Sequence, residues 1–399
     1  MKAAPLAGTR VLDLSTMIAA PLAASLMSDW GASVIKVEQP GHGDHVRRFG
    51  AQSDGQGLYW KTLSRGKRSL AIDLHNPAGQ DLVRRLASTH DVLIENFRPG
   101  TLERWNLGPS VLHEANPSLV ILRMTAFGQF GPYRTRAGFG TLAEAMSGIA
   151  AVTGFADRPP LLPALPLADV LAGFLSSSAV LAALLRRARD GSGETIDFAI
   201  YEAALKAVEL QVLEYDANGT LHTRHGNQIE DAAPRGAYRC GDGRWIALSG
   251  STQAVAERVL RTIGGDELVN DPRFKTNVER VENSDALDKL IDDWCAQRTR
   301  EVTLETFSAM GCAVGPLESI DTMLENEQVI ARGSIATVDD PDLGPLRMTN
   351  VYPRFEETPL PVPPPGDARV GEQTREILQD ELGLTGAEID RLFAAGTVA

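Results

Sequence analysis

The first 125 residues alternate between short apolar runs and segments whose apolar positions recur with helical spacing. The runs have the length of buried strands, whereas residues 18–30 and 77–87 have the length and period of helices. Pro21 fits the first turn of the earlier helix and Asn76 fits the cap of the later one. The predicted strands cover residues 9–15, 32–38, 70–74, 91–95 and 119–124. Strands that alternate with helices are typical of a parallel, doubly wound sheet, so we predict an α/β domain.

The pattern changes after residue 218. Residues 236–239 and 245–249 resemble short strands around the turn 241–243, and charged helical patterns follow them. A proline-rich stretch, 359–365, predicts a stiff extended linker before two final helices at 374–382 and 386–394. We therefore predict a large α/β domain over 1–218, a smaller α+β domain over 219–325, and a return to the large domain over 326–399.

One acid stands where an extended, proline-bounded stretch meets a long apolar run. Residues 163–173 read PALPLADVLAG, and the run continues to Leu185. Because this run is apolar nearly all round, it predicts a buried helix with Asp169 at or near its N-terminus. The amides and dipole of that terminus would stabilise a carboxylate. Taken alone, the pattern also fits a simple N-cap at Asp169.

Composition narrows the classes of partner. The 399 residues carry a net charge of −13, which argues against nucleic acid as the main partner. Residues 1–110 nevertheless hold 13 Lys and Arg against 10 Asp and Glu. This excess suits a polyanionic small molecule, although a solvated surface would give the same count. Three widely spaced cysteines predict neither a disulfide framework nor a metal site, and no unbroken run of about 18 apolar residues predicts a membrane span.

The turn after the first predicted strand reads STMIAAP and lacks the G-x-G-x-x-G fingerprint of dinucleotide-binding folds. An ordinary nicotinamide-dependent oxidoreductase is therefore disfavoured despite the α/β pattern, because fold alone does not give function. The N-terminus leads directly into a strand pattern without the apolar core of a signal peptide, so a cytoplasmic location is the expectation.

Several segments form an ordered set along the chain. They are 27–38 (MSDWGASVIKVE), 41–44 (GHGD) with Arg47, 66–74 (GKRSLAIDL), 91–100 (DVLIENFRPG) with Arg104, 165–173 (LPLADVLAG) and 371–374 (GEQT). Together they resemble the class III CoA-transferase family, which includes formyl-CoA transferases, carnitine CoA-transferases and the related α-methylacyl-CoA racemases. The resemblance implies a Rossmann-like large domain with a parallel sheet built from both chain ends, a small middle domain, and an interlocked homodimer.

The same resemblance assigns chemistry to Asp169, which matches the covalent nucleophile of the transferases. Its carboxylate would attack an acyl-CoA thioester, giving an aspartyl anhydride and then an aspartyl-CoA thioester. An incoming carboxylic acid would then reverse these steps and leave as its own CoA ester. An unperturbed aspartate is ionised at neutral pH, so the nucleophile needs no activating base. Coenzyme A would enter and leave as part of substrate and product, with no tightly bound cofactor or metal.

The resemblance also predicts which residues bind CoA. Arg98 and Arg104 suit phosphate oxygens, because a guanidinium presents several donors in a plane. An exposed helical arginine, a surface turn at His75 and a core position for Phe97 are the alternatives for three of these residues. The full set of predicted contacts is Ile18, Ala19, Gln39, Ile72, His75, Asn96, Phe97, Arg98, Arg104, Arg136 and Phe139.

Some positions depart from the family pattern. Gln39 stands where an arginine is common, and Phe139-Gly140 replaces a tyrosine–acid pair of the formyl-CoA transferases. No glycine-rich loop matches the one that covers their active site. The acceptor is therefore open. Arg134 and Arg136 suit the distal carboxylate of an acid, although a solvated arginine cluster fits the sequence equally well, and we expect a small dicarboxylic acid with succinyl-CoA or acetyl-CoA as donor.

Two other functions remain open at this point. A racemase would need a histidine as its second base, and the chain has Phe139 at that position, although His225 or another histidine could replace it. A non-catalytic acyl-CoA-binding relative would have no use for an attacking carboxylate at Asp169.

Overall fold

The computed structural model describes residues 2–399. These residues group into two compact units. Unit 1 comprises residues 2–149, 162–209 and 333–399, and unit 2 comprises residues 150–161 and 210–332. These two units do not decide whether residues 1–218, 219–325 and 326–399 are separate domains, so the predicted domain boundaries stay a prediction.

Unit 1 is built on a six-stranded sheet in the order β5-β2-β1-β6-β7-β8, with every neighbouring pair parallel. The strands are β1 (Arg10–Asp13), β2 (Ser33–Glu38), β5 (Lys67–Ala71), β6 (Val92–Glu95), β7 (Val120–Thr125) and β8 (Glu194–Ala199). This is a doubly wound strand order. Strands are added from β1 outward to β5 and then from β6 outward to β8, so the direction of addition reverses between β1 and β6. The predicted parallel α/β fold is confirmed.

Two details of the sheet differ from the predictions. β5 begins at Lys67, three residues earlier than expected, because the buried side chains of Lys67 and Ser69 occupy strand positions beside β2. All six strands lie between residues 10 and 199, so the C-terminal end contributes helices to unit 1 and no strand to this sheet. β8 was not predicted, since only its last two residues are fully buried.

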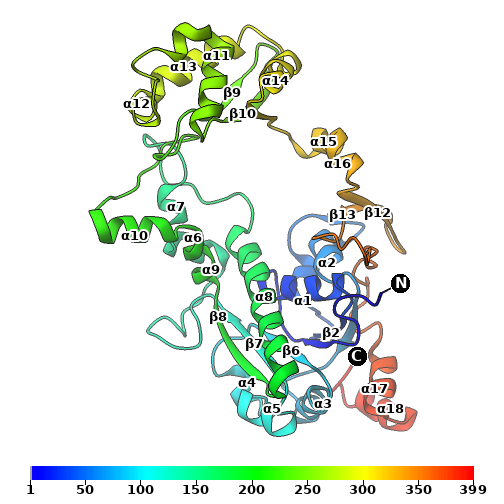
Figure 1. Ribbon diagram of the computed structural model, residues 1–399. Coiled ribbons are helices and arrows are strands. Elements are labelled where there is room, and N and C mark those ends of the chain that lie inside the picture. The colour runs from blue at the N-terminus through cyan, green and yellow to red at the C-terminus, as the bar shows by residue number, and fades with distance from the viewer. Residues whose placement is uncertain (1) are drawn as a thin grey trace. The chain divides into compact units, whose positions relative to one another are not determined.

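Helices cover both faces of the sheet (Figure 1). Alternate strand residues face opposite sides, with Val11, Val34 and Val92 in one core and Leu12, Ile35 and Leu93 in the other. The first core includes residues of α1 (Ala19–Asp29), α6 (Gly140–Met146), α8 (Leu167–Asp190) and α9 (Ile200–Ala207). The second includes residues of α3 (Pro77–Ala87), α4 (Thr101–Arg104), α5 (Pro109–Ala115), α17 (Thr374–Leu382) and α18 (Gly386–Ala394).

α8 is longer and less buried than its apolar sequence predicted. Phe174, Leu175 and Leu185 are all exposed, so the expectation of a helix buried all round is wrong. The physical reason is that α8 packs only one side against α1, α9 and the sheet. By length and hydropathy this helix could also cross a membrane, and in unit 1 one of its sides packs into the first core.

The smaller elements of unit 1 are η1 (His45–Arg48), β3 (Gln52–Ser53), β4 (Gln56–Gly57), α2 (Leu58–Leu63), β12 (Ile335–Asp340) and β13 (Gly344–Thr349). Residues 359–365, predicted as an extended linker, contain no helix or strand. The two final helices begin and end where the sequence predicted.

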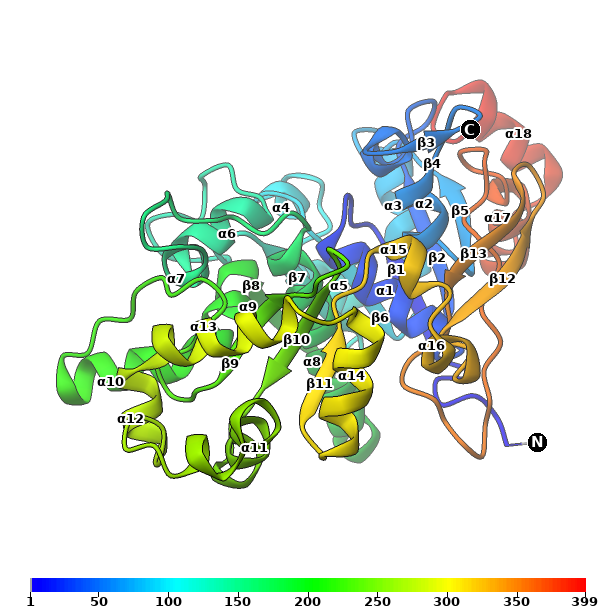
Figure 2. The same ribbon diagram turned by 90° about the horizontal axis from the view of Figure 1, so that it is seen from above.

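Unit 2 contains an antiparallel sheet in the order β11-β10-β9 with helices packed on it. This arrangement agrees with the α+β pattern expected after residue 218. The strands are β9 (Arg235–Arg239), β10 (Trp245–Ser249) and β11 (Ala313–Pro316). The helices from residue 209 to 331 are α10 (Glu209–Asn218), α11 (Gln253–Val269), α12 (Asn277–Glu282), α13 (Ser284–Cys295), α14 (Arg300–Ala309), α15 (Ile320–Met323) and α16 (Glu327–Ala331); α7 (Ile149–Val152) precedes α8. Figure 2 shows the same elements from a second direction.

Candidate active site

A cavity of about 1070 Å³ lies at the carboxyl ends of the parallel strands of unit 1. Its walls come from the segments that follow β1, β6, β7 and β8, from α6 and the start of α8, and from Phe49 and Tyr59. Ligands of doubly wound sheets bind at this edge, where neighbouring connections diverge. The cavity therefore has the position expected of a ligand site, and every segment of its wall belongs to unit 1.

Asp169 lies in this wall as the third residue of α8. The cap position is Pro166, which supplies no side-chain hydrogen bond, so the interpretation of Asp169 as an N-cap is wrong. Within residues 2–399, no hydrogen bond or ion pair engages its half-buried carboxylate. Burial, with a smaller contribution from the charge of Glu144, raises the pKa of Asp169 to about 6. An unpaired carboxylate of this basicity is a competent nucleophile at neutral pH.

Glu144 was not singled out from the sequence. It lies on α6, lines the cavity, and is 2% exposed. Its Oε1 accepts the backbone N–H of Ala168 at 3.1 Å, at the start of α8. The sequence signal was weak, because a glutamate four residues after Gly140 on a short helix is usually a surface residue.

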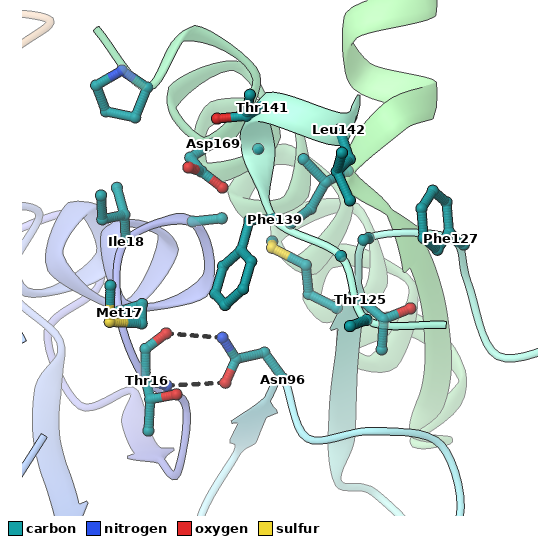
Figure 3. Close-up of a pocket in the computed structure, with 18 of the residues that line it drawn as sticks. Thr16, Met17, Ile18, Asn96, Thr125, Phe127, Phe139, Thr141, Leu142 and Asp169 are labelled. Carbon is teal, nitrogen blue, oxygen red and sulfur yellow. Dashed lines mark hydrogen bonds between the residues drawn. The ribbon is translucent and has the colours of Figure 1, made fainter. Parts of the chain in front are cut away.

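Gly140 begins α6 directly beside the nucleophile. A Cβ atom at this position would lie 2.5 Å from Oδ2 of Asp169. Only glycine leaves the carboxylate its present place. The replacement of the tyrosine–acid pair by Phe139-Gly140 is therefore a feature of the site itself. Figure 3 shows the exposed Phe139 ring and the Asp169 carboxylate projecting into the same cavity.

Side-chain hydrogen bonds of Asn96 and Asp44 fix the turn after β1. Asn96 donates to the carbonyl of Thr16 at 2.7 Å and accepts its N–H at 2.8 Å, the two bonds drawn in Figure 3. Met17 has a positive φ of 69°, and its N–H is held by Asp44 at 3.1 Å. Ile18 and Ala19, which follow, are thereby fixed at the cavity wall.

Buried charges support the same turn. Lys36 donates to the carbonyl of Ser15 and pairs with Asp44 at 3.0 Å, while Lys67 pairs with Asp13 at 2.9 Å. Burial disfavours the charge of Lys36, but the carboxylates of Asp13 and Asp44 hold its pKa above the usual value. The turn therefore rests on a compact ionic network that keeps its backbone in one conformation.

The structure brings most of the predicted site residues together. Ile18, Ala19, Asn96, Phe97, Arg98, Arg136, Phe139 and Asp169 all line the cavity. Arg134 lines it as well, so three arginines, Arg98, Arg134 and Arg136, line the same cavity as Asp169. Arg136 stacks on the ring of Tyr133 at 3.6 Å from its centroid.

Gln39, Ile72, His75 and Arg104 are not part of this wall. The side chain of Ile72 is fully buried in the second core, so any ligand contact there would have to use its backbone. Arg104 donates to Thr101 at 2.9 Å, and the amide of Gln39 donates to Asp73 at 3.4 Å. Their roles in CoA binding stay predictions.

Trp105 is a neighbour that the sequence did not reveal. His75 packs edge-on against its ring with centroids 5.3 Å apart, and Phe97 does so at 5.0 Å. This row of aromatic rings connects His75 with Phe97 in the cavity wall. The rings meet at 75° and 77°, so they form an edge-on cluster and no flat surface.

Comparison with known proteins agrees with this geometry. Residues 6–374 match the sequence pattern of CoA-transferase family III. The chain belongs to this family. The match confirms the resemblance that the motifs indicated. Members of the family use CoA thioesters as substrates.

Characterised relatives cover nearly the full length of the chain. It is 42% identical to succinyl-CoA–D-citramalate CoA-transferase of Chloroflexus aurantiacus, over 98% of this chain and 97% of the relative. It is 38% identical to the beta subunit of succinyl-CoA–L-malate CoA-transferase of the same organism, over 97% and 96%. A crystal structure of a CaiB/BaiF family protein from Brucella suis superimposes with a TM-score of 0.83 at 31% identity, covering 95% of this chain and all of the other.

Proposed function

We propose that this CoA-transferase moves CoA from succinyl-CoA to a small dicarboxylic acid through covalent intermediates on Asp169. The observation that carries the proposal is the unpaired carboxylate of Asp169 in the cavity wall, at the N-terminus of α8. A carboxylate that served only the fold would be expected to have a hydrogen-bond donor or cation beside it.

In the first step Asp169 acts as the nucleophile. The Asp169 carboxylate attacks the thioester carbonyl, a C–O bond forms, and the C–S bond breaks to release CoA thiolate. The thiolate then attacks the aspartyl carbonyl of the anhydride, which frees the donor acid and leaves Asp169 as a CoA thioester. The acceptor acid repeats these two steps in reverse. Because every intermediate is an anhydride or a thioester, an activated acyl group is kept throughout, and the transfer needs no nucleotide hydrolysis.

The amides around Asp169 supply stabilisation for the oxyanions. The first N–H groups of a helix have no partner within it, so the start of α6 beside the carboxylate would supply donors. In α8 the N–H groups of Leu167 and Ala168 already donate to Leu165 and Glu144. The apolar side chains of Ile18, Phe139 and Leu165 in the same wall would exclude water from the anhydride. Both features suit acyl transfer between bound acids.

The cations of the cavity support an acid with a second carboxylate. Arg134 and Arg136 line the wall on the loop that leads into α6, and neither forms an ion pair within residues 2–399. A guanidinium binds a carboxylate with two parallel hydrogen bonds. The two Chloroflexus relatives are named for citramalate and malate, which are both dicarboxylic acids, with succinyl-CoA as partner. We therefore place the distal carboxylates of donor and acceptor at these arginines.

CoA itself would follow the turn after β1 and the loop after β6, where Ile18, Ala19, Asn96 and Arg98 lie. His75, whose ring is exposed and packs edge-on against Trp105, would offer its own face to the adenine. These contacts are the ones expected from the motifs, and the rigid support of the turn by Asn96 and Asp44 favours them.

A homodimer is part of the proposal. α10 has no buried residue, and Leu210, Leu213 and Tyr215 are more than half exposed on it. The exposed leucines and phenylalanine of α8 add apolar surface in unit 1. A second copy of the chain would cover such surface, and light scattering after size-exclusion chromatography should show twice 42.9 kDa. A Leu213→Glu variant should then shift the population toward monomer.

The racemase alternative gains no support from the cavity. No histidine is among the described residues that line it, and Phe139 stands at the position of the second base. Exchange of the α-proton of a 2-methylacyl-CoA in deuterated water would nevertheless favour that function over transfer.

Trapping the intermediate tests the proposal directly. The protein is mixed with succinyl-CoA, hydroxylamine is added, and the peptide containing Asp169 is analysed by mass spectrometry. A hydroxamate at Asp169, or CoA attached to its peptide, is the expected result. An unmodified peptide while CoA is being transferred to an added acid would overturn the covalent mechanism. The matched control is Asp169→Asn, which should show no modification.

A further inference from the structure

We propose that Glu144 is the positioning residue of Asp169, fixing the first turn of α8 and keeping a negative charge beside the nucleophile. This inference rests on the proposed function and deepens it. Neither the family motifs nor the names of the relatives assign a role to this residue. Three features support the role: a hydrogen bond, a burial state and an arrangement of charges.

The hydrogen bond replaces a missing helix cap. Pro166 occupies the cap position of α8 and has no side chain able to accept a hydrogen bond. The Oε1 atom of Glu144 accepts the N–H of Ala168 at 3.1 Å instead. Ala168 precedes Asp169 in the same turn, so an acid from another helix sets the orientation of the nucleophile. A cap supplied from a separate helix also couples α6, with Gly140, to α8.

The burial state shows that this contact is not incidental. Glu144 is 2% exposed, and no lysine or arginine forms an ion pair with it anywhere in residues 2–399. Carboxylates are seldom buried without a cation, because desolvation costs free energy. A structural role alone would be met equally by a neutral glutamine, whose carbonyl oxygen accepts the same hydrogen bond.

Among the charged groups that line the cavity, Glu144 is the one whose charge affects the ionisation of Asp169. Asp169 shares no hydrogen bond with a donor, and the charge of Glu144 opposes its ionisation. The other titratable or charged groups that line the cavity are Tyr59, Arg98, Arg134 and Arg136. None of these contributes to the raised pKa of Asp169, which burial and Glu144 together account for.

The like charge has a chemical consequence. When the Asp169 carboxylate attacks the thioester, its oxygen becomes part of a neutral anhydride and the negative charge leaves on the CoA sulfur. Repulsion from Glu144 is present before this step and absent after it. The repulsion therefore raises the energy of the free carboxylate and favours its acylation. The repulsion stays absent in the Asp169–CoA thioester that follows, because Asp169 is neutral there as well.

The test compares Glu144→Gln, which keeps a hydrogen-bond acceptor and removes the charge, with Glu144→Ala, which removes both. Glu114→Gln, at an exposed position on α5, is the matched control. Modification of Asp169 by a carbodiimide with glycine ethyl ester, followed by mass spectrometry across pH, reports its protonation without turnover. Single-turnover labelling with succinyl-CoA reports the acylation rate, and thermal unfolding followed by circular dichroism reports folding.

We expect the midpoint of carbodiimide labelling to move to lower pH in Glu144→Gln and to stay unchanged in Glu114→Gln. Acylation of Glu144→Gln should be slower by about tenfold, and that of Glu144→Ala slower still. KM for succinyl-CoA should change less than kcat in both.

An unchanged midpoint and acylation rate in Glu144→Gln would overturn the inference even if Glu144→Ala fails to fold. The carbodiimide midpoint stands apart from the proposed function. If the wild-type protein is acylated by no donor, the proposed function fails, while a shifted midpoint would still support the charge coupling of Glu144 to Asp169.

Discussion

Gly140 and Asp169 are in closer contact than any other residue type at position 140 would allow. A Cβ atom on Gly140 would lie 2.5 Å from Oδ2 and 2.7 Å from Cγ of Asp169. The two residues come from different helices, α6 and α8, and are 29 positions apart in the sequence. The position of the nucleophile therefore depends on the absence of a side chain from a neighbouring helix.

Gly140→Ala should impair catalysis while leaving the fold intact. The added methyl group must displace the Asp169 carboxylate, since contacts under 3 Å do not persist. We expect kcat to fall by at least about 10²-fold, because a displacement of about 1 Å has that effect on a reacting group. Gly386→Ala on α18 is the matched control, as a Cβ there meets no atom within 4 Å. Unchanged kcat in Gly140→Ala would show that the carboxylate acts from another position.

The pH dependence should reveal the raised pKa of Asp169. Only the ionised carboxylate attacks the thioester, so kcat/KM should fall with unit slope as the pH drops below about 6. A stopped assay over pH 4.5–8.5 in buffers of constant ionic strength measures this limb. An acid limb near pH 4 would contradict this prediction, because it would mean that the pKa of Asp169 is not raised in the working enzyme.

Asp169→Asn should make the folded protein more stable at neutral pH while abolishing transfer. The folded state holds a proton on Asp169 more tightly than the unfolded state, where the pKa is 3.8. The stability contributed by this group is therefore full at low pH and is lost as pH rises through about 6. The free energy of unfolding of Asp169→Asn minus that of the wild type should be about 1–3 kcal/mol more favourable at pH 8 than at pH 4. Urea unfolding at both pH values measures the gain, and a loss at pH 8 would contradict it.

Replacing the two cavity arginines should separate dicarboxylic from monocarboxylic substrates. In the double variant Arg134→Met with Arg136→Met, a distal carboxylate loses its partners. KM for succinyl-CoA and for a dicarboxylic acceptor should rise by tenfold or more, the effect of about 1.4 kcal/mol or more of lost charge-assisted hydrogen bonding. KM for acetyl-CoA should change little, and Arg189→Met at the far end of α8 is the control for lost surface charge. Equal changes for both donors would place the distal carboxylate elsewhere.

Arg123→Met should destabilise unit 1 strongly. Glu95 at the end of β6 is fully buried, and Arg123 donates to it at 2.8 Å and to the exposed Glu103 at 2.8 Å. Removing the guanidinium leaves a buried carboxylate without a cation, which costs about 3–5 kcal/mol. Glu103→Gln removes only the exposed half of the network and should cost less than about 1 kcal/mol. Chemical denaturation compares the two, and equal losses would mean that the buried pair has no special weight.

Much of the fold follows from local sequence. The strands β1, β2, β6 and β7 and the helices α1 and α3 formed within a few residues of their predicted positions, because apolar period and capping residues act over short distances. β5 and β8 were harder, since polar side chains such as Lys67 fill strand positions that only the buried partner Asp13 makes favourable.

The sequence by itself determined the parallel α/β fold, the family and the choice of Asp169 as the candidate nucleophile, because helix starts and motif spacing are properties of neighbouring residues. Only the tertiary structure decided that Asp169 is no cap, that Gly140 leaves room for its carboxylate, and that Glu144 accepts a hydrogen bond from Ala168, the residue before it. These relationships join residues from separate helices, α6 and α8. Their free energies depend on contact and burial, which arise only when the chain has packed.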